Sequence, residues 1–250
     1  MKQEVLVSVI MPAYNAEQYI EESTASVLNQ TFRNIELIIV NDCSTDNTLD
    51  IIKNISQKDI RVIVIDNTTN LGCADSRNKA LVEANGEYIA FCDSDDVWGS
   101  EKIKKQLNHI KNSNADMIFT AYEMVDSNGV FIKSRSVKQE LILDDLLKEN
   151  SVIFSSTLFK KESIKEFCFD SHWFHEDYVF LLECLKKNLK FCGINEALVK
   201  YRVHNNGRSF NKINAAKHRW KIYREFLKLG MLKSWCYLFV YMLNGIKKYM

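Results

Sequence analysis

Four consecutive residues, Asp93-Ser94-Asp95-Asp96, place three carboxylates directly after an apolar run at residues 87–92. Carboxylates this close repel one another unless a cation or hydrogen-bond donors compensate. Hard oxygen ligands suit Mg²⁺ or Mn²⁺, especially beside a diphosphate group. The alternative is a solvated turn before a helix, where aspartate is common. The position at the end of an apolar strand favours the metal site.

A second acidic pair, Glu176 and Asp177, begins a segment with helical spacing at residues 176–188. A carboxylate within hydrogen-bond reach of a hydroxyl group can act as a general base, and a helix N-terminus favours its ionised form. One member of the pair could act as the base while the other orients it. Ordinary acidic charge at a helix start explains the pair equally well, so the residues alone leave both interpretations open.

Basic residues form two weaker candidates. Arg202, His204 and Arg208 flank the run 205–207, Asn-Asn-Gly, and could close over a diphosphate as a flexible lid, or simply lie in a surface loop. Arg77 begins a helical segment, where it could reach a phosphate or form a surface salt bridge.

Aromatic and histidine side chains precede the second acidic pair. Trp173 lies between His172 and His175, and these side chains could stack against a sugar or donate hydrogen bonds to it. Histidines with a purely structural role are more common, and this alternative stays open.

The elements that must position these residues alternate between two periodicities. Short runs rich in Val and Ile predict parallel strands covered on both faces, at residues 5–11, 35–41, 61–66 and 87–92. Segments with helical spacing lie between them, at residues 16–29, 46–56 and 74–84. Asn15 and the pair Ser44-Thr45 stand where N-caps of the first two helices are expected. This alternation predicts a doubly wound α/β sheet, whose ligands bind at the carboxyl ends of its strands.

The later half of the chain is less regular. We expect a helix over residues 98–112, a hairpin of residues 116–122 and 130–133 around Asn128-Gly129, and a helix over 176–188.

Composition excludes several classes of protein. The chain has 250 residues with 33 Lys and Arg against 32 Asp and Glu, so disorder and low complexity are excluded. Eight glycines and one proline argue against a β-sandwich with many tight turns. Seven scattered cysteines indicate neither a disulfide framework nor a zinc site, and favour a reducing compartment. Neither a G-x-G-x-x-G nor a Walker sequence occurs, which excludes Rossmann dehydrogenases and P-loop enzymes.

Several ordered motifs together resemble one known family. They are Val7-Ser8-Val9-Ile10-Met11-Pro12-Ala13-Tyr14-Asn15, the run 36–48 around Asn41-Asp42, Asn70-Leu71-Gly72 with Arg77-Asn78, and Asp93-Ser94-Asp95-Asp96. This pattern is similar to that of the family 2 inverting glycosyltransferases of GT-A fold. The resemblance is dense over about the first hundred residues. It continues more thinly through residues 173–178 and 201–204.

The resemblance implies roles for individual residues. Asp42 would contact the uracil of a UDP-sugar, and residues at the Ala13-Tyr14 turn would line the base. Pro12 and Asn15 would belong to the same nucleotide-sugar site. Asp93 and Asp95 would hold ribose and a Mn²⁺ or Mg²⁺ ion, and Asp177 would be the catalytic base, with Glu176 beside it. The nucleotide-sugar site would also include Asn70, Gly72, Arg77 and Ser94, and the acceptor site Trp173 and His175. The sequence carries Cys43 where many members have a glycine or another small residue.

The expected activity is therefore transfer of a hexose or N-acetylhexosamine from a UDP-sugar to a hydroxyl of a glycan, carried on a lipid, in bacterial surface polysaccharide assembly. A sugar nucleotidyltransferase uses a similar sheet but predicts a Gly-rich basic loop after the first strand, which Pro12-Ala13-Tyr14-Asn15 does not provide. Loss of the carboxylates at the two acidic sites would favour a non-catalytic glycan-binding or membrane-scaffold protein. All four are present: Asp93, Asp95, Glu176 and Asp177.

The tail from Asn205 onward differs in charge from the rest of the chain. It carries ten basic residues and one acid, Glu225, so the preceding residues are net acidic. Lys217, Lys221, Arg224 and Lys228 are spaced along one predicted helical face, beside an apolar arc of Ala216, Trp220, Tyr223 and Leu227. Basic residues beside Trp and Tyr suit an anionic membrane surface better than nucleic acid.

We therefore predict a GT-A-like domain over residues 1–205, with a nucleotide-binding half at 1–100 and an acceptor-binding half at 101–205. A helical tail, 206–250, would associate with the membrane through residues 211–248, or pack on the catalytic body or on a partner subunit of a homodimer. Since no segment approaches the roughly 20 apolar residues of a spanning helix, we expect a cytoplasmic protein that is peripheral on the inner face of the membrane.

Overall fold

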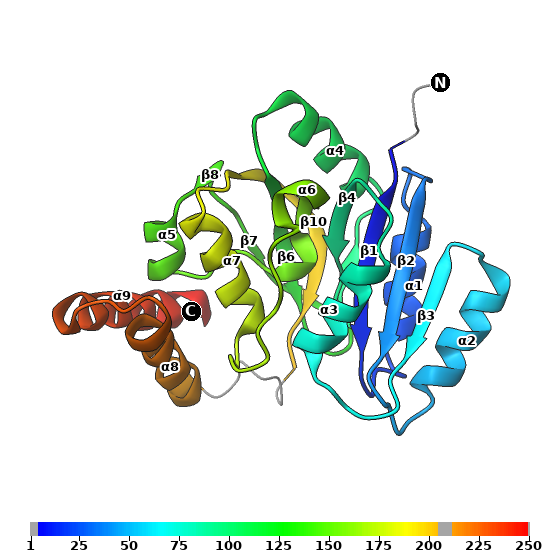
Figure 1. Cartoon of the computed structure of the whole chain (residues 1–250), viewed down its shortest axis with the longest axis horizontal. Coiled ribbons are helices and arrows are strands. Elements are labelled where there is room, and N and C mark those ends of the chain that lie inside the picture. Colours follow the sequence, from blue (N-terminus) through cyan, green and yellow to red (C-terminus); the bar gives the residue numbers. More distant parts are fainter. Residues whose placement is uncertain (1–4, 205–211, 250) are drawn as a thin grey trace.

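The computed structural model describes residues 5–204 and 212–249 of the chain (Figure 1). Its strands are β1 (Val7–Ala13), β2 (Ile35–Asn41), β3 (Val62–Asp66), β4 (Tyr88–Phe91), β5 (Val97–Trp98), β6 (Met117–Val125), β7 (Phe131–Arg135), β8 (Glu140–Leu141), β9 (Leu158–Lys160) and β10 (Phe191–Arg202). Its α-helices are α1 (Ile20–Leu28), α2 (Thr48–Lys58), α3 (Cys73–Glu83), α4 (Lys102–Asn112), α5 (Leu143–Lys148), α6 (Lys161–Ile164), α7 (Glu176–Lys186), α8 (Lys212–Lys221) and α9 (Met231–Tyr249).

One mixed sheet runs through this described part of the molecule. Its strand order is β3-β2-β1-β4-β9-β6-β10-β5, with β7 paired to β6 and β8 paired to β10. Strands β1 to β4 are parallel, as their continuous apolar sequences predict. Strand β9 runs antiparallel between β4 and β6, while β6 and β10 are parallel to each other. The predicted doubly wound, mostly parallel α/β sheet is confirmed.

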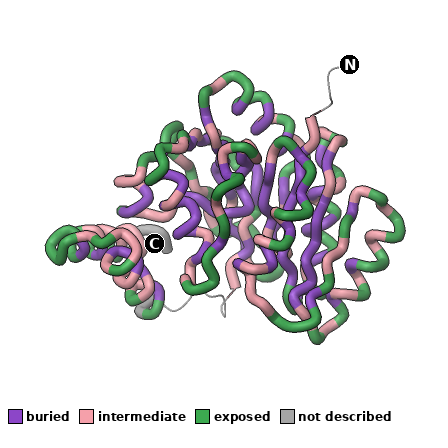
Figure 2. Tube along the Cα trace, in the orientation of Figure 1, coloured by how far each residue is buried: buried purple, intermediate pink, exposed green. Residues whose placement is uncertain are grey.

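Alternate residues of the central strands feed two apolar layers. Ile10 and Ile38 pack on the face covered by α3 and α7, whereas Val9 and Leu37 pack on the face covered by α1, α2 and α4. Every residue of β1 is buried, and Figure 2 shows the buried trace concentrated in the central strands. Because a parallel strand covered on both faces is apolar at successive positions, this core follows directly from the sequence pattern.

Two local expectations are wrong. Helix α1 begins at Ile20 and α2 at Thr48, and neither has a side-chain N-cap hydrogen bond. Asn15 instead accepts a hydrogen bond from the backbone N–H of Thr45 (2.8 Å) and donates its own backbone N–H to Ser44 Oγ (3.1 Å). These polar residues therefore tie the ends of β1 and β2 together rather than capping helices.

The later half also follows the sequence in outline. β6 and β7 form the expected hairpin, where Asp126 accepts the backbone N–H groups of Asn128 and Val130 and Gly129 has a φ of 81°. Trp98, expected at the start of a helix, instead lies in strand β5 against β10, and α4 begins only at Lys102.

The tail consists of two helices joined by a π-helical turn at Ile222–Phe226. Lys228 lies beyond this turn with a φ of 51°, so the expected basic face that includes Lys228 is wrong. Of the predicted apolar arc, Tyr223 is fully buried and donates its hydroxyl to the backbone oxygen of Leu147 (2.6 Å). In the view of Figure 1 the tail lies beside α5 and α7, at the opposite end of the molecule from α2.

The inner face of the tail packs on the body of the molecule. Leu238 of α9 is buried, and the Tyr237 hydroxyl donates to Asp144 Oδ1 of α5 (2.7 Å). The buried guanidinium of Arg219 lies 3.5 Å from the ring centre of Tyr178 in α7. The tail therefore packs on the body of the molecule, which was one of the expected arrangements, but this packing covers only one of its faces.

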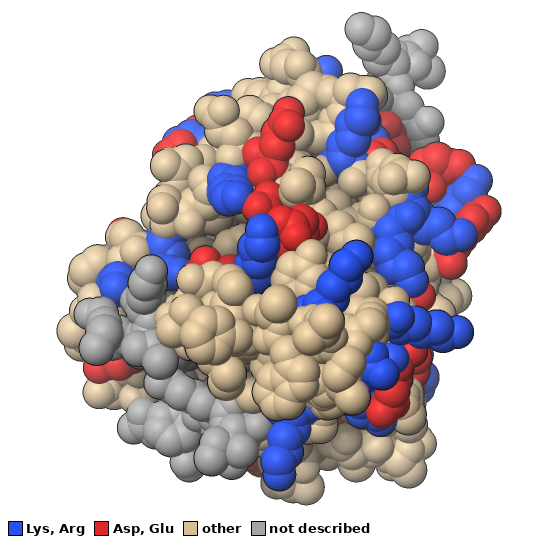
Figure 3. Space-filling view, turned by 90° about the vertical axis from the view of Figure 1, so that its left-hand side faces the viewer, with Lys and Arg blue, Asp and Glu red and all other residues tan. Residues whose placement is uncertain are grey.

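The outer face of α9 remains apolar and exposed. Its exposed large side chains recur at helical spacing and are Met231, Leu232, Trp235, Phe239, Met242 and Leu243. Figure 3 views the molecule from this side and shows a broad uncharged area in its lower half, with Lys and Arg side chains along the border. Within the residues that the structure describes, no helix is long and apolar enough to cross a membrane.

Candidate active site

The carboxyl ends of β1 and β2 form a polar edge organised by Asp42. This buried carboxylate accepts the backbone N–H groups of Leu71 (2.9 Å) and Gly72 (2.8 Å) and the side-chain amide of Asn67 (2.9 Å). Gly72 precedes α3 with a φ of 85°, in the left-handed region that favours glycine. Asp42 therefore fixes the loop between β3 and α3 against the end of β2.

The neighbouring residues differ in what they can offer a ligand. Pro12 and Ala13 are buried within β1, while the ring of Tyr14 is about half exposed at its end. Asn70 donates its side-chain amide to the backbone oxygen of Asp42 (3.2 Å). Cys43 has a φ of 61°, a conformation that a glycine would adopt without strain. Tyr14 is the ring that a planar base could stack on at this edge.

The three carboxylates after β4 point in different directions. Asp93 pairs with Arg77, and Asp95 Oδ2 lies 2.9 Å from His204 Nε2. Asp96 is buried, where Oδ1 accepts the backbone N–H of Arg202 (3.0 Å) and Oδ2 has no hydrogen-bond partner. Burial raises the pKa of Asp96 well above its usual range, and the charge of Asp95 adds to this. Of the three carboxylates, Asp93 and Asp95 are therefore the candidates for binding a ligand.

The backbone of this turn is held by neighbouring elements. Asp93 donates its N–H to Ser155 Oγ (2.9 Å), and the carbonyl oxygen of Ser94 accepts the Ser23 hydroxyl (2.9 Å). Sequence reasoning missed Ser155 because it lies in a stretch without clear periodicity.

Arg202 was expected in a flexible lid, and the structure corrects this. Its side chain is 3% exposed, with Nε donating to the backbone oxygen of Asp95 (2.9 Å) and a terminal nitrogen 2.8 Å from Glu22 Oε2. The guanidinium also lies 4.6 Å from the ring centre of Tyr19. Arg202 is thus a fixed link between α1 and the acidic turn, while Arg208 lies outside the described residues.

His204 was assigned to the same lid, and the structure instead places it against the acidic turn. Besides its contact with Asp95, its ring lies 5.2 Å from that of Tyr19. Among the described residues no group of three or more His, Cys, Asp or Glu side chains could hold a metal ion. A carboxylate and an imidazole at this distance form a pair of suitable ligands, to which a bound diphosphate could add oxygens.

Arg77 joins the acidic turn to the second acidic pair. Its guanidinium is buried, with one terminal nitrogen 2.8 Å from Asp93 Oδ1 and the other 3.1 Å from Glu176 Oε1. The rings of Phe154 and Phe169 lie 4.9 and 5.5 Å from it. Of the two expectations for Arg77, the salt bridge is present, but it is buried rather than on the surface, and a contact with a phosphate stays a prediction.

The second acidic pair begins α7 as expected. Glu176 is buried, whereas Asp177 is partly exposed and its Oδ1 accepts the backbone N–H of Tyr178 (2.7 Å). Burial raises the pKa of Asp93, against the lowering effect of Arg77, and the charges of Asp95 and Asp177 raise it further. The acidic turn after β4 and the acidic pair of α7 are therefore close enough to affect each other's ionisation.

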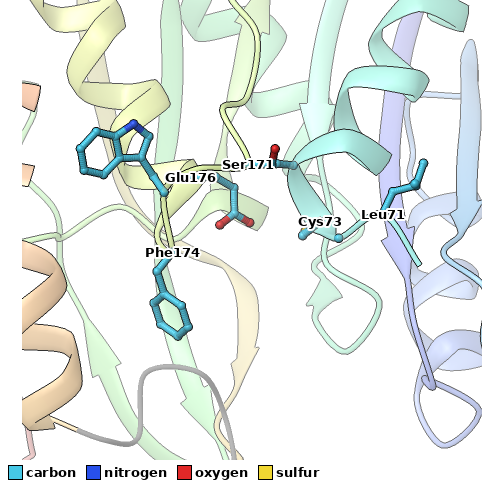
Figure 4. A pocket seen from close by; sticks show the side chains of 8 residues that line it. Leu71, Cys73, Ser171, Phe174 and Glu176 are labelled. Carbon is cyan, nitrogen blue, oxygen red and sulfur yellow. The ribbon is translucent and has the colours of Figure 1, made fainter. Parts of the chain in front are cut away.

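A pocket of about 190 Å³ separates the N-termini of α3 and α7. Its lining residues are Leu71, Gly72, Cys73, Ala74, Ser171, Trp173, Phe174 and Glu176. In Figure 4, Leu71 and Cys73 lie on one side, Phe174 on the other, and the Glu176 carboxylate projects between them. Of the predicted acceptor residues, Trp173 lines this pocket, while the ring of His175 packs against Phe174 (4.9 Å) and His218 (6.1 Å).

Comparison with known proteins identifies related chains that match over nearly their whole length. A Bacillus subtilis protein named as a teichuronic acid biosynthesis glycosyltransferase, TuaG, is 39% identical over 245 residues, which cover 97% of each chain. The Escherichia coli protein WfgD, named as a UDP-Glc:alpha-D-GlcNAc-diphosphoundecaprenol beta-1,3-glucosyltransferase, is 34% identical over 98% of this chain and 95% of its own.

Solved structures show the same fold. S. aureus TarS, residues 1–349 in complex with UDP-GlcNAc, superposes with a TM-score of 0.73 at 24% identity, covering 94% of this chain and 71% of that one. The family model described as glycosyl transferase family 2 matches residues 8–174. The family and the GT-A fold that the motifs predict are confirmed, and the chain belongs to glycosyl transferase family 2, whose members are inverting glycosyltransferases.

Proposed function

We propose that this chain transfers a hexose or N-acetylhexosamine from a UDP-sugar to a hydroxyl of a lipid-linked glycan, in the assembly of a surface polysaccharide. The observation that carries the proposal is the Arg77 bridge, because one guanidinium contacts both Asp93 of the nucleotide edge and Glu176 of the pocket. A transfer reaction needs its two substrates held next to each other, and this contact supports donor and acceptor regions that adjoin in one site. Two Escherichia coli relatives, WfgD and WfaP, are named as UDP-Glc:alpha-D-GlcNAc-diphosphoundecaprenol beta-1,3-glucosyltransferases, and this supports the choice of substrates.

The UDP moiety would bind along the edge formed by β1, β2 and the loop before α3. The uracil would stack on the half-exposed ring of Tyr14. Asp42 already accepts three N–H groups, but two carboxylate oxygens offer about four lone-pair positions, so it can accept one more from the base. The loops at this edge would be held in place for UDP by the hydrogen bonds of Asn15, Asn70 and Ser94.

Asp95 and Asp93 would hold a divalent metal ion, with His204 as a neighbouring ligand. Two carboxylates and an imidazole fit Mn²⁺ or Mg²⁺ chemically, and Asp95 and His204 are 2.9 Å apart. A bound divalent ion would neutralise negative charge on the departing UDP. Asp93 also touches Arg77, so the position of this carboxylate is fixed before any ligand arrives.

Asp177 would act as the catalytic base. It is the more exposed member of the acidic pair, while Glu176 is held by Arg77 inside the pocket wall. The acceptor hydroxyl would lose its proton to Asp177 as its oxygen attacks the anomeric carbon from the face opposite UDP, which inverts the configuration. Trp173 and Phe174 would supply apolar surface for the acceptor sugar in the pocket.

The outer face of α9 would rest on the inner face of the cytoplasmic membrane. It presents an exposed row of large apolar side chains that includes Trp235 and Phe239, with basic side chains along its border. Membrane attachment would raise the local concentration of a lipid-linked acceptor.

The activity is tested by measuring UDP release from a set of UDP-sugars, with and without Mn²⁺ or Mg²⁺. We expect Asp95→Ala to abolish metal-dependent release with little loss of stability, and the exposed Asp50→Ala on α2 to retain wild-type activity. Wild-type turnover of Asp95→Ala in Mn²⁺ would overturn the metal assignment. No release from any nucleotide sugar by the wild-type protein would overturn the proposed activity.

Membrane attachment is tested with Phe239→Glu, because this side chain points away from the body of the molecule. Its control is Ile60→Glu, a fully exposed apolar residue between α2 and β3. We expect only Phe239→Glu to reduce sedimentation with phosphatidylglycerol vesicles. Equal binding by the two variants would refute the α9 surface.

A further inference from the structure

The wall of the pocket continues outward onto the tail. The ring of Phe174, which lines the pocket, is stacked on His218 of α8 at 4.4 Å with an angle of 10° between the rings. Trp173, also in the lining, lies 5.8 Å from Phe226 of the π-helical turn. The surface of the tail is therefore continuous with the pocket that contains Glu176.

Two basic side chains meet on this continuation. Lys221 Nζ lies 3.2 Å from Nε2 of His172, and 5.4 Å from the ring centre of Trp173. Lys217, one turn earlier in α8, is exposed on the surface. An acidic neighbour, Glu225, lies 3.7 Å from Lys221, and its side chain is more than half exposed, so it compensates the lysine only weakly.

Beyond these cations the surface becomes apolar. Trp220, next to Lys221 in sequence, contacts Trp235 of α9 with ring centres 4.8 Å apart. Trp235 belongs to the exposed row of α9 that continues through Phe239 and Leu243. Three chemically distinct zones thus follow one another: a pocket with an aromatic wall, a basic pair, and an apolar helix face. Side-chain contacts join the first zone to the second. The second zone joins the third through Trp220, the neighbour of Lys221 in sequence, which contacts Trp235.

We propose that His172 and Lys221 form a subsite for the diphosphate group of a prenyl-diphosphate-linked acceptor, whose sugar occupies the pocket and whose hydrocarbon lies on α9. This inference rests on the proposed function and specifies the acceptor within it. The order of sugar, diphosphate and hydrocarbon in such a molecule is the order of the three zones. Because Lys221 Nζ and His172 Nε2 are only 3.2 Å apart, one diphosphate group could accept hydrogen bonds from both side chains at once.

The binding of farnesyl diphosphate to the full-length protein tests the subsite. The protein is first saturated with UDP and Mg²⁺, so that the nucleotide site is occupied, and binding is measured by titration calorimetry. We expect the double variant His172→Gln/Lys221→Gln to bind farnesyl diphosphate about tenfold more weakly, or worse, because charge-assisted hydrogen bonds are lost. Its control, Lys53→Gln on the exposed surface of α2, removes a positive charge at the far end of the molecule and should bind like the wild type.

Two comparison ligands identify what the subsite recognises. Farnesol should bind more weakly than farnesyl diphosphate, and equally to wild type and double variant, because it lacks the anionic group. Inorganic pyrophosphate that binds as tightly as farnesyl diphosphate would show a site for the free anion and overturn the lipid-linked ligand. Unchanged binding of farnesyl diphosphate by the double variant would overturn the subsite itself.

Two further measurements distinguish the subsite from a membrane-binding surface and from the nucleotide site. If the double variant lost affinity for phosphatidylglycerol vesicles but kept farnesyl diphosphate, the two side chains would serve the membrane surface and the proposal would be wrong. Normal UDP binding by the wild type without farnesyl diphosphate binding would overturn the subsite alone. Failure to bind UDP would overturn the proposed function, and the subsite with it.

Discussion

Replacing Arg77 by methionine should destabilise the protein, because it removes the ion pairs with Asp93 and Glu176. Methionine fills much of the same volume between Phe154 and Phe169 but leaves two carboxylates without their cation. Removing one partner of a buried ion pair typically costs about 3–5 kcal/mol. Glu176, at 7% side-chain exposure, would carry most of this cost, whereas Asp93, at 35%, is partly solvated and contributes less. We therefore expect a loss of about 3 kcal/mol in the free energy of unfolding, measured by urea denaturation at pH 7.

A second substitution separates the charge effect from packing. In the double variant Arg77→Met/Glu176→Gln the buried carboxylate is neutral, so about half of the lost stability should return. Arg77→Lys should fold better than Arg77→Met but recover little activity, because one ammonium group cannot make both contacts of the planar guanidinium. A loss below about 1 kcal/mol for Arg77→Met, or no recovery in the double variant, would refute the ion-pair reasoning.

The sign of the pH dependence provides an independent check. Without Arg77, the pKa of the buried Glu176 should rise above that of the unfolded chain, about 4.3. The unfolded chain then loses this proton at lower pH than the folded protein. The stability deficit of Arg77→Met should therefore be small near pH 4 and grow as the pH rises, by at most about 1.4 kcal/mol per unit. A deficit that shrinks with rising pH would contradict this reasoning.

Three further predictions test other parts of the site. Asp177→Asn should lower kcat by roughly 10²–10⁴ while UDP-sugar binding persists, and a normal kcat with lost donor affinity would place Asp177 in the donor site instead. Since burial raises the pKa of Asp96, the free energy of unfolding should fall as the pH rises above about 4. Asp96→Asn keeps an oxygen that accepts the backbone N–H of Arg202, and it should remove this fall when unfolding is measured in urea. The same pH profile in wild type and variant would refute the role of Asp96. Gly72→Ala should cost about 1 kcal/mol and weaken UDP binding, because φ is 85° there, and unaltered UDP affinity would disconnect this loop from the nucleotide.

The parallel half of the sheet could be predicted from the sequence because each strand is buried on both faces. In β2, whose bounds match the prediction, such burial requires successive apolar residues, and this pattern has no helical alternative at that length. The ends of helices were harder to predict. Asn15 and Ser44 have the side chains of N-caps, but their hydrogen bonds join two loops about 30 residues apart, and local sequence does not encode that contact.

In the candidate site, too, local sequence patterns could be recognised, whereas contacts between distant segments could not. The sequence could single out Asp93, Asp95, Glu176 and Asp177 as candidates because carboxylates beside the ends of helices and strands are a local signal. The contacts of Arg77 and Arg202 could not be predicted, because an arginine in a polar loop looks the same in sequence whether it meets a phosphate or a carboxylate of the protein. Ser155 and Phe174 offer no distinctive local pattern, and only the folded chain shows that they touch the acidic turn and line the pocket.

The tail shows why basic charge alone did not define its role. Arg219 and Lys221 are two residues apart, yet Arg219 is buried against Tyr178 while Lys221 lies on the surface beside His172. A helix turns about 200° over two residues, so these neighbours face nearly opposite directions. One cation fixes the tail to the body, and this fixed position places the other at the outer edge of the pocket. The proposed acceptor subsite therefore depends on the same packing that the sequence-based expectation treated as an alternative to membrane binding.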